Sequence, residues 1–212
     1  MITIVLLISV VAMGATALVL ATKLYRAREI RVKLQNLVID LRNSEEILKT
    51  QAYVDPLTGL GNRNLLMDRF RSALERSRRS RKPFALLMID LDRFKEINDR
   101  YGHATGDFVL ITIARRLVDS VRASDTVVRW GGDEFVLIIE SIEERSELDL
   151  VGQKLIDMLS ERVTLKPGVN VSLGGSIGFG VYPVDGGNME DLLAAADKAM
   201  YECKTSRLMP LF

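Results

Sequence analysis

Cysteine and histidine are almost absent from this sequence, and an excess of either charge is missing. The 212 residues include one cysteine and one histidine, and 29 basic residues balance 28 acidic ones to a net charge of +1. A single cysteine excludes an internal disulfide framework. A nucleic-acid binder usually carries a basic excess, so we expect no nucleic-acid polymer among the partners. Hydrophobic residues at 48% exclude a disordered chain, and the length suits one domain with an appendage.

One long segment has no charge at all. Residues 2–22 form an apolar run of 21 residues, which as a helix spans roughly 30 Å, the thickness of a bilayer's hydrocarbon core. Basic residues follow from Lys23 onward, which favours a cytoplasmic C-terminal side. A cleaved signal peptide is the alternative, but its basic start is missing and the run is long for one. The sequence therefore predicts a transmembrane helix over 1–22 and a single-pass protein of the cell inner membrane with a cytoplasmic domain.

The next segment, 23–52, has a narrow apolar stripe. Its members recur at alternating spacings of four and three: Ile30, Leu34, Leu37, Leu41, Ser44 and Leu48. This period is typical of the seam of a parallel coiled coil. An amphipathic helix packed on its own domain or on a membrane surface is the alternative. We expect a helical connector that pairs two copies of the chain.

The remaining residues, 53–212, predict one α/β domain. Asn62 is placed to cap a helix that runs to about Ser80, and the apolar run 84–89 indicates a buried central strand that ends on Asp90. Helices are expected over 92–100, 107–120, 141–162 and 188–204. Two strands, 126–130 and 135–140, flank a Gly-Gly hairpin turn, and 169–181 holds one further strand or two. This order favours an α/β sandwich with a mixed sheet.

Three carboxylates come together in this scheme. Asp90 ends the central strand, and Asp133 and Glu134 follow the hairpin turn. If the two strands are neighbours, the three side chains converge at one edge of the sheet. Carboxylate oxygens suit Mg²⁺ rather than zinc, and such a centre is typical of phosphoryl transfer. The alternative is that Asp133 and Glu134 are ordinary polar residues of a solvated turn.

Several motifs decide between these interpretations, because in this order they resemble the GGDEF family of diguanylate cyclases. That family joins two GTP molecules into cyclic di-GMP with release of pyrophosphate, on a palm-like sheet akin to those of nucleotide cyclases. The resemblance covers about residues 53–204. The matching segments are 55–63 (DPLTGLGNR), 90–98 (DLDRFKEIN), 101–107 (YGHATGD), 129–135 (RWGGDEF), 176–178 (SIG) and 195–201 (AADKAMY).

The resemblance implies a metal centre and two catalytic residues. Asp90 and Asp133 would ligate Mg²⁺ (or Mn²⁺), together with the backbone carbonyl of Leu91. Glu134 would either ligate the metal or take the proton from the attacking 3′-hydroxyl, and the sequence does not choose between these two roles. Asp133 and Glu134 are therefore the expected catalytic residues.

The resemblance also implies a binding site for GTP. Asn98 and Asp107 would read the guanine edge, for which an amide and a carboxylate are suited. The alternative is that Asn98 caps the end of one helix and Asp107 the start of the next. Phe94 and Lys95 would face the triphosphate. Lys204 and Arg207 would bind the terminal phosphates, although Arg207 stands one residue earlier than in the family pattern.

Arg122 and Asp125 form an RxxD sequence, which resembles the family's inhibitory site for the product cyclic di-GMP. A plain surface salt bridge is the alternative.

We therefore expect a Mg²⁺-dependent diguanylate cyclase that acts as a homodimer, is inhibited by its product and is anchored in the membrane. Two further functions stay open at this point. One is a catalytically weak receptor for GTP or cyclic di-GMP, and the other is a membrane scaffold for a sensor subunit.

Overall fold

The computed structural model describes residues 13–14, 20, 22–26, 28–31, 33–42, 44, 52–166 and 169–208. The chain divides into two compact units, Met1–Thr50 and Gln51–Phe212, and each is described here by itself.

The described residues of the first unit are helical, and they overturn one expectation. Among the residues that the structure describes, no helix combines the length and the apolar character that a bilayer span needs. The predicted location, single-pass in the cell inner membrane, is therefore wrong. Most of the run 2–22, on which the predicted transmembrane helix depended, lies outside the described residues.

The predicted coiled-coil seam is partly described. Ile30, Leu34, Leu37 and Leu41 are helical, and each is more than half exposed in the single chain. Leu48 lies outside the described residues. Pairing of two chains along this seam stays a prediction.

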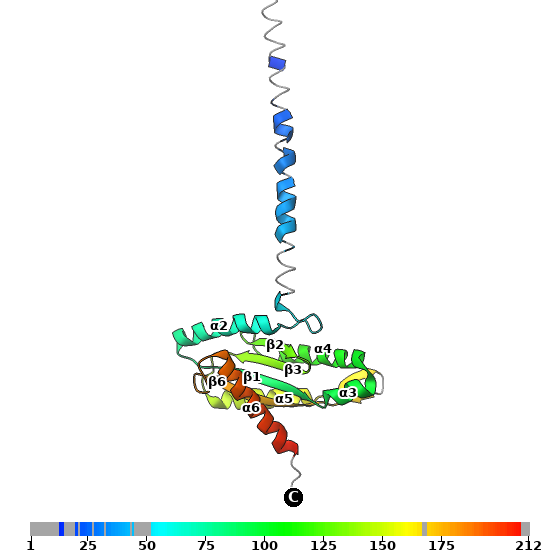
Figure 1. Ribbon diagram of the computed structural model, residues 1–212, viewed down its shortest axis with the longest axis vertical. Coiled ribbons are helices and arrows are strands. Elements are labelled where there is room, and N and C mark those ends of the chain that lie inside the picture. The colour runs from blue at the N-terminus through cyan, green and yellow to red at the C-terminus, as the bar shows by residue number, and fades with distance from the viewer. Residues whose placement is uncertain are drawn as a thin grey trace, which may run out of the picture. The chain divides into compact units, whose positions relative to one another are not determined.

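A four-stranded sheet with strand order β2-β3-β1-β6 forms the centre of the second unit (Figure 1). Its strands pair antiparallel, and Gly61, which lies outside the strands, forms an isolated parallel bridge with Val128. β4 and β5 form a separate antiparallel pair. The elements are α2 (Arg63–Ser80), β1 (Phe84–Asp92), α3 (Phe94–Tyr101), α4 (His103–Ser120), β2 (Thr126–Gly131), β3 (Glu134–Ile139), α5 (Arg145–Ser160), β4 (Val163–Lys166), β5 (Val169–Val171), β6 (Gly174–Tyr182) and α6 (Met189–Leu208).

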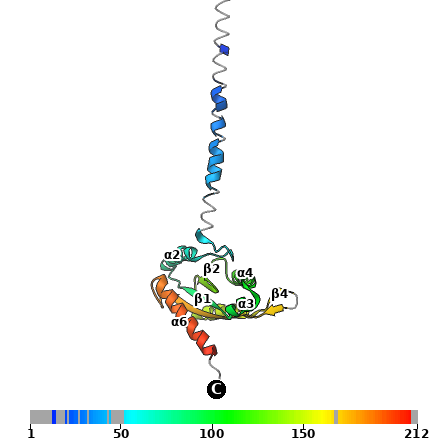
Figure 2. The same ribbon diagram turned by 45° about the vertical axis from the view of Figure 1, so that its right-hand side comes forward.

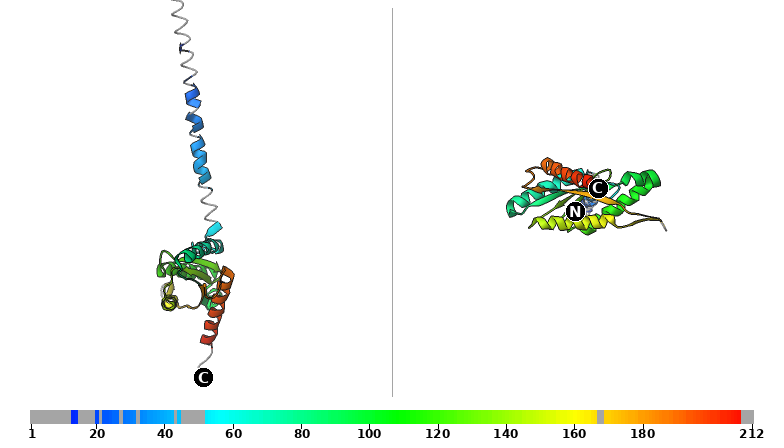
Figure 3. Two further views of the ribbon diagram at one scale, coloured as in Figure 1. Left: turned by 90° about the vertical axis from the view of Figure 1, so that its left-hand side faces the viewer. Right: turned by 90° about the horizontal axis from the view of Figure 1, so that it is seen from below.

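Helices cover both faces of this sheet, as the sequence predicts for an α/β domain. Alternate residues of β1 enter two different cores, because side chains of a strand point to opposite faces in turn. Ala85, Leu87 and Ile89 pack against α4 and α5, whereas Leu86 and Met88 pack against α2 and α6. Figure 2 shows α2 and α6 on one side of the sheet and α3 and α4 on the other, and the view from below in Figure 3 shows α6 (orange to red) and α5 (yellow-green) on opposite sides.

Local capping explains where the sequence interpretation succeeds and where it fails. Asn62 caps α2 as predicted, since its side-chain oxygen accepts from the backbone N–H groups of Asn64 and Leu65. The box that starts α5 consists of Glu144 and Glu147, whereas the sequence predicts Ser141 and Glu144. β1 runs two residues beyond Asp90 because the strand continues to pair with β6. The sequence patterns do not predict β4.

Candidate active site

The carboxylate cluster is built by strand register. Asp90 of β1 lies opposite Glu134 of β3, and the backbone N–H of Leu91 donates to the carbonyl of Asp133 at 3.3 Å. Asp90 and Glu134 follow the same alternation as Leu86, Met88, Val136 and Ile138, which face α2 and α6. The predicted convergence of Asp90, Asp133 and Glu134 at one end of the sheet is therefore present in the fold.

The hairpin turn that carries Asp133 needs glycine. Gly132 has a φ of 54°, in the left-handed region that a side chain disfavours. Two hydrogen bonds then fix the carbonyl of Gly132, because Nε and Nη2 of Arg129 donate to it at 3.1 and 2.8 Å. The turn is thus held immediately before Asp133, so the position of this carboxylate does not depend on a free loop.

Electrostatic repulsion follows from this arrangement. Partial burial raises the pKa of Glu134 above its ordinary value, and the negative charges of Asp90, Asp133 and Asp197 raise it further. Burial, with Asp90 as an added cause, likewise raises the pKa of Asp133. A cluster of acids that disfavours its own ionisation in this way is a place where a cation binds favourably.

A cationic side chain already contacts the cluster. Nζ of Lys204, near the end of α6, lies 2.7 Å from Oδ1 of Asp90, and the Asp90 side chain is 18% exposed. The hydrogen bond to Asp90 raises the pKa of Lys204, so the ammonium stays charged. Lys204 therefore occupies the position of a counter-ion at this carboxylate.

The donor set at this site suits a hard divalent cation. Among the described residues, no group of three or more His, Cys, Asp or Glu side chains is placed so that it could hold a metal ion. The chemistry nevertheless fits Mg²⁺, because the donors are carboxylate oxygens that repel one another, and a cation, the Lys204 ammonium, stands at one of them. Mg²⁺ keeps several waters and needs few protein ligands.

The structure contradicts the helix-capping interpretation of Asn98 and Asp107. α3 ends with Gly102 as its cap, and α4 begins at His103, so neither residue stands at a helix end. Asn98 lies over Gly106, where any Cβ would collide with Oδ1 of Asn98. This close approach places the Asn98 amide beside the residue that precedes Asp107, and the Asp107 side chain is exposed. Asn98 is therefore next to the neighbour of Asp107 in the sequence, and neither residue caps a helix.

The predicted phosphate-binding residues are in different environments. Phe94 begins α3 but its ring is buried, so only its backbone N–H is suited to an anion, whereas Lys95 is exposed. Lys204 contacts Asp90 in this state. Arg207 lies in the last turn of α6, and its side chain is outside the part of the chain that the structure describes.

Asp125 of the RxxD sequence organises its own turn. Its carboxylate accepts from the backbone N–H groups of Arg122, at 2.9 Å, and Glu140, at 3.2 Å. Arg122 has a largely exposed side chain, 3.8 Å from the carboxylate of Glu147. Arg122 and Asp125 line the same surface pocket.

A network that the sequence interpretation missed holds the hairpin to the start of the domain. Nη1 of Arg129 lies 3.3 Å from Oδ1 of Asp55, which also accepts from Oγ1 of Thr58 at 2.6 Å. The Arg63 guanidinium lies over the Trp130 ring at 4.4 Å and donates to the Trp130 carbonyl at 2.6 Å. Asp55 and Arg129 both belong to family motifs, but 74 residues separate them and spacing alone does not reveal their contact.

Comparison with known proteins decides the family. The family described as diguanylate cyclase, GGDEF domain, matches residues 52–209. The chain belongs to this GGDEF family. It is 38% identical over 198 residues to the bifunctional diguanylate cyclase/cyclic di-GMP phosphodiesterase MucR of Pseudomonas aeruginosa, a match that covers 93% of this chain and 28% of that protein. Membership of the family, and relatives named as diguanylate cyclases, support this activity for the domain.

Solved GGDEF structures have the same fold. The GGDEF domain of TpbB from Pseudomonas aeruginosa superposes with a TM-score of 0.70 at 39% identity, over 73% of this chain and 90% of that one. The coiled coil and GGDEF domain of DgcB from Caulobacter crescentus, in complex with c-di-GMP, gives a TM-score of 0.73 at 26% identity, over 84% and 94% of the two chains. The chain spans only 20% to 38% of the length of the first curated relatives it matches.

The contacts of Asp55 predict how the stability of the domain depends on pH. Burial opposes ionisation of Asp55, but hydrogen bonds from Thr58 and the charge of Arg129 outweigh it and lower its pKa below 3.8. A carboxyl group whose pKa is lower in the folded than in the unfolded state stabilises the fold at pH values above its unfolded-state pKa. This stabilisation is lost as the pH falls through the folded-state pKa. Asp55→Asn should therefore lower the free energy of unfolding by about 1–2 kcal/mol at pH 7. Urea unfolding should show a difference in the free energy of unfolding between the unaltered chain and Asp55→Asn. This difference should be constant from pH 7 to 5 and should narrow below pH 4. A difference that grows on acidification would contradict the role of this ion pair.

Proposed function

We propose that this chain is a Mg²⁺-dependent diguanylate cyclase that acts as a homodimer and is inhibited by its product. The observation that carries the proposal is the register of Asp90 opposite Glu134, with Asp133 fixed beside them by the hairpin. Asn98 and Asp107 do not cap a helix, and in this proposal they form a recognition site for guanine close to the end of β1.

In this proposal Asp90 and Asp133 hold Mg²⁺ together with the carbonyl of Leu91. Mn²⁺ would serve equally, since it prefers the same oxygen donors. When bound, the ion supplies Lewis-acid activation of the α-phosphate and lowers the pKa of the attacking hydroxyl. Lys204 and Arg207 then face the terminal phosphates, with the backbone N–H groups of Phe94 and Lys95 at the start of α3 as further donors.

Glu134 is the proposed general base. Its raised pKa makes it a better proton acceptor than an ordinary glutamate, and it faces the same side as Asp90. Glu134 takes the proton of the 3′-hydroxyl as the oxygen bonds to the α-phosphorus of the second GTP. The bond from that phosphorus to the bridging oxygen breaks, and pyrophosphate leaves with the electron pair.

The cyclic product requires two such reactions in opposite directions. Each protomer holds one GTP, so two protomers must face each other across a two-fold axis. The exposed seam of Ile30, Leu34, Leu37 and Leu41 is suited to hold the two copies together and to raise their effective concentration.

Activity of the full chain tests the proposal directly. With GTP and Mg²⁺, we expect chromatography to show cyclic di-GMP and pyrophosphate. Glu134→Gln should lower the rate at least about 100-fold, because it removes the base and a charge beside the metal. Glu190→Gln, the same change at the start of α6 away from the cluster, is the matched control. Binding of GTP or cyclic di-GMP without any product in the unaltered chain would point to a receptor.

Lys204 allows the metal site to be tested without catalysis. Because its ammonium neutralises Asp90, Lys204→Gln should tighten Mn²⁺ binding in the absence of nucleotide about five- to tenfold. Electron paramagnetic resonance of free Mn²⁺ measures this affinity. Lys198→Gln makes the same charge change on the same helix and should leave it almost unchanged. Equal Mn²⁺ affinities of Lys204→Gln and Lys198→Gln would exclude the idea that Lys204 and the metal ion compete for Asp90.

The RxxD pocket is the proposed inhibitory site. Arg122→Ala should raise the cyclic di-GMP concentration that gives half-inhibition about tenfold or more, because a charged hydrogen-bond donor to the product is lost. Initial rates without added product should stay within about twofold, since Arg122 is remote from Asp90 in the fold. Arg115→Ala, an exposed change on α4, is the control. Unchanged inhibition in Arg122→Ala would place the product site elsewhere.

A further inference from the structure

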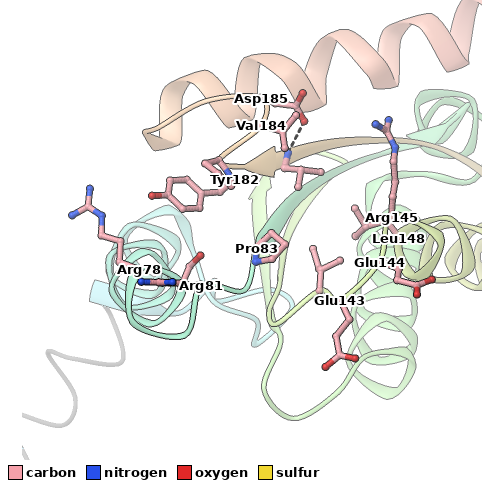
Figure 4. Close-up of a pocket in the computed structure, with 14 residues that line it drawn as sticks. Arg78, Arg81, Pro83, Glu143, Glu144, Arg145, Leu148, Tyr182, Val184 and Asp185 are labelled. Carbon is pink, nitrogen blue, oxygen red and sulfur yellow. Dashed lines mark hydrogen bonds between the residues drawn. The ribbon is translucent and has the colours of Figure 1, made fainter.

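A second pocket lies at the other end of the central strand. It is bounded by the end of α2, by Pro83 just before β1, by the loop between β3 and α5 with the start of α5, and by the end of β6 with the loop that follows (Figure 4). Phe84, which begins β1 and pairs with Tyr182, is six residues from Asp90, a separation of about 20 Å along a strand. We call this the distal pocket. It shares no residue with the carboxylate cluster.

The floor of the distal pocket is apolar. Ile142 and Leu148, both 3% exposed, form part of it, and Val184, 77% exposed, stands at its rim. Tyr182 stacks on Phe84 with ring centroids 5.2 Å apart, which holds one wall in place. The volume of about 480 Å³ lies within the range of small-molecule sites and is too confined for a folded partner.

Three acids and three arginines line the rim of the pocket, and the two sets differ in their partners. Each acid is already engaged: Glu143 pairs with Lys82 at 2.7 Å, Glu144 caps α5, and Asp185 accepts from the backbone N–H of Val181 at 2.8 Å. In the described part of the chain, no carboxylate lies within ion-pair distance of the three guanidiniums at the rim. These belong to Arg78, Arg81 and Arg145.

Arg81 also occupies an unfavourable backbone position. It caps α2 with a φ of 59°, in the left-handed conformation where helices most often place glycine. A side chain there costs on the order of 1 kcal/mol. An arginine at this position places a guanidinium at the lip of the pocket, which a glycine would leave bare.

We propose that the distal pocket binds a small amphiphilic anion: a flat apolar body that lies on Ile142, Leu148 and Tyr182, with a carboxylate, sulfonate or phosphate group toward the arginines. Apolar walls with a few polar groups around them are typical of such sites. Guanidinium groups are suited to planar anions, which they bind through paired N–H donors. The proposal does not depend on cyclase activity.

Two dyes with the same ring system test it on the full chain. Anilinonaphthalene sulfonate carries the anion, and neutral phenylnaphthylamine lacks it. We expect the sulfonate to bind at least about tenfold more tightly, measured by fluorescence titration. Arg78→Gln and Arg145→Gln should each weaken sulfonate binding about five- to tenfold and change the binding of the neutral dye less than twofold.

The controls separate the pocket from general charge and from background binding. Arg79→Gln makes the same change one residue from Arg78, but Arg79 does not line the pocket, so its dye affinity should match that of the unaltered chain. Val184→Glu adds a carboxylate at an exposed rim position and should abolish sulfonate binding at the pocket without affecting the fold. The proposal would be overturned if the unaltered chain bound the two dyes with equal affinity. It would also be overturned if the sulfonate bound equally well to the control Arg79→Gln and to the three pocket variants, Arg78→Gln, Arg145→Gln and Val184→Glu.

Discussion

The pairing of β1 with β3 is the constraint on which the candidate active site depends. It sets Asp90 opposite Glu134, and a shift of one residue would turn every side chain of one strand to the other face of the sheet. Such a shift would turn Glu134 toward α4 and α5 and would move core residues of one face into the differently shaped core of the other face. The hydrophobic packing of both faces therefore enforces the position of the carboxylates, although these groups repel one another. The cost of that repulsion is offset in part by Lys204, which reaches Asp90 because α6 packs along β6 and β1.

The hairpin turn is held from outside the sheet as well as by its strands. Arg129 connects the Gly132 carbonyl to Asp55, so the turn that carries Asp133 is tied to the first turn of the domain. Asp55 is in turn fixed by Thr58. A displacement of Asp55 would therefore move Arg129, and through the two hydrogen bonds from Arg129 to the Gly132 carbonyl it would shift the turn without a change in the strands. This makes the opening motif part of the support of the site, even though none of its residues belongs to the carboxylate cluster.

Local signals in the sequence predict most of the elements, and tertiary contacts explain where they fail. The cap at Asn62, the buried strand from Phe84 and the Gly-Gly turn each depend on nearby residues, so short-range reasoning finds them. The polar residues Asp90 and Asp92 predict an earlier end for β1, yet pairing with β6 extends the strand through them. The motifs identify Lys204 and Asp90 separately. Their contact joins residues 114 apart, and only the packing of α6 on the sheet brings them together.

The local charge of each region in this domain depends on which ionised side chains are paired, not on the total numbers of acidic and basic residues. The whole chain has a net charge of +1, which by itself suggests no preference for an ionic ligand. At one end of β1, however, acids outnumber their cationic partners, and partial burial together with their mutual repulsion raises the pKa values of Asp133 and Glu134. At the other end the acids are engaged with Lys82 and with backbone N–H groups, which leaves arginines without carboxylate partners among the described residues. A balanced composition can thus hold one region that favours a cation and another that favours an anion. The two are kept apart by the length of a single strand, so neither neutralises the other.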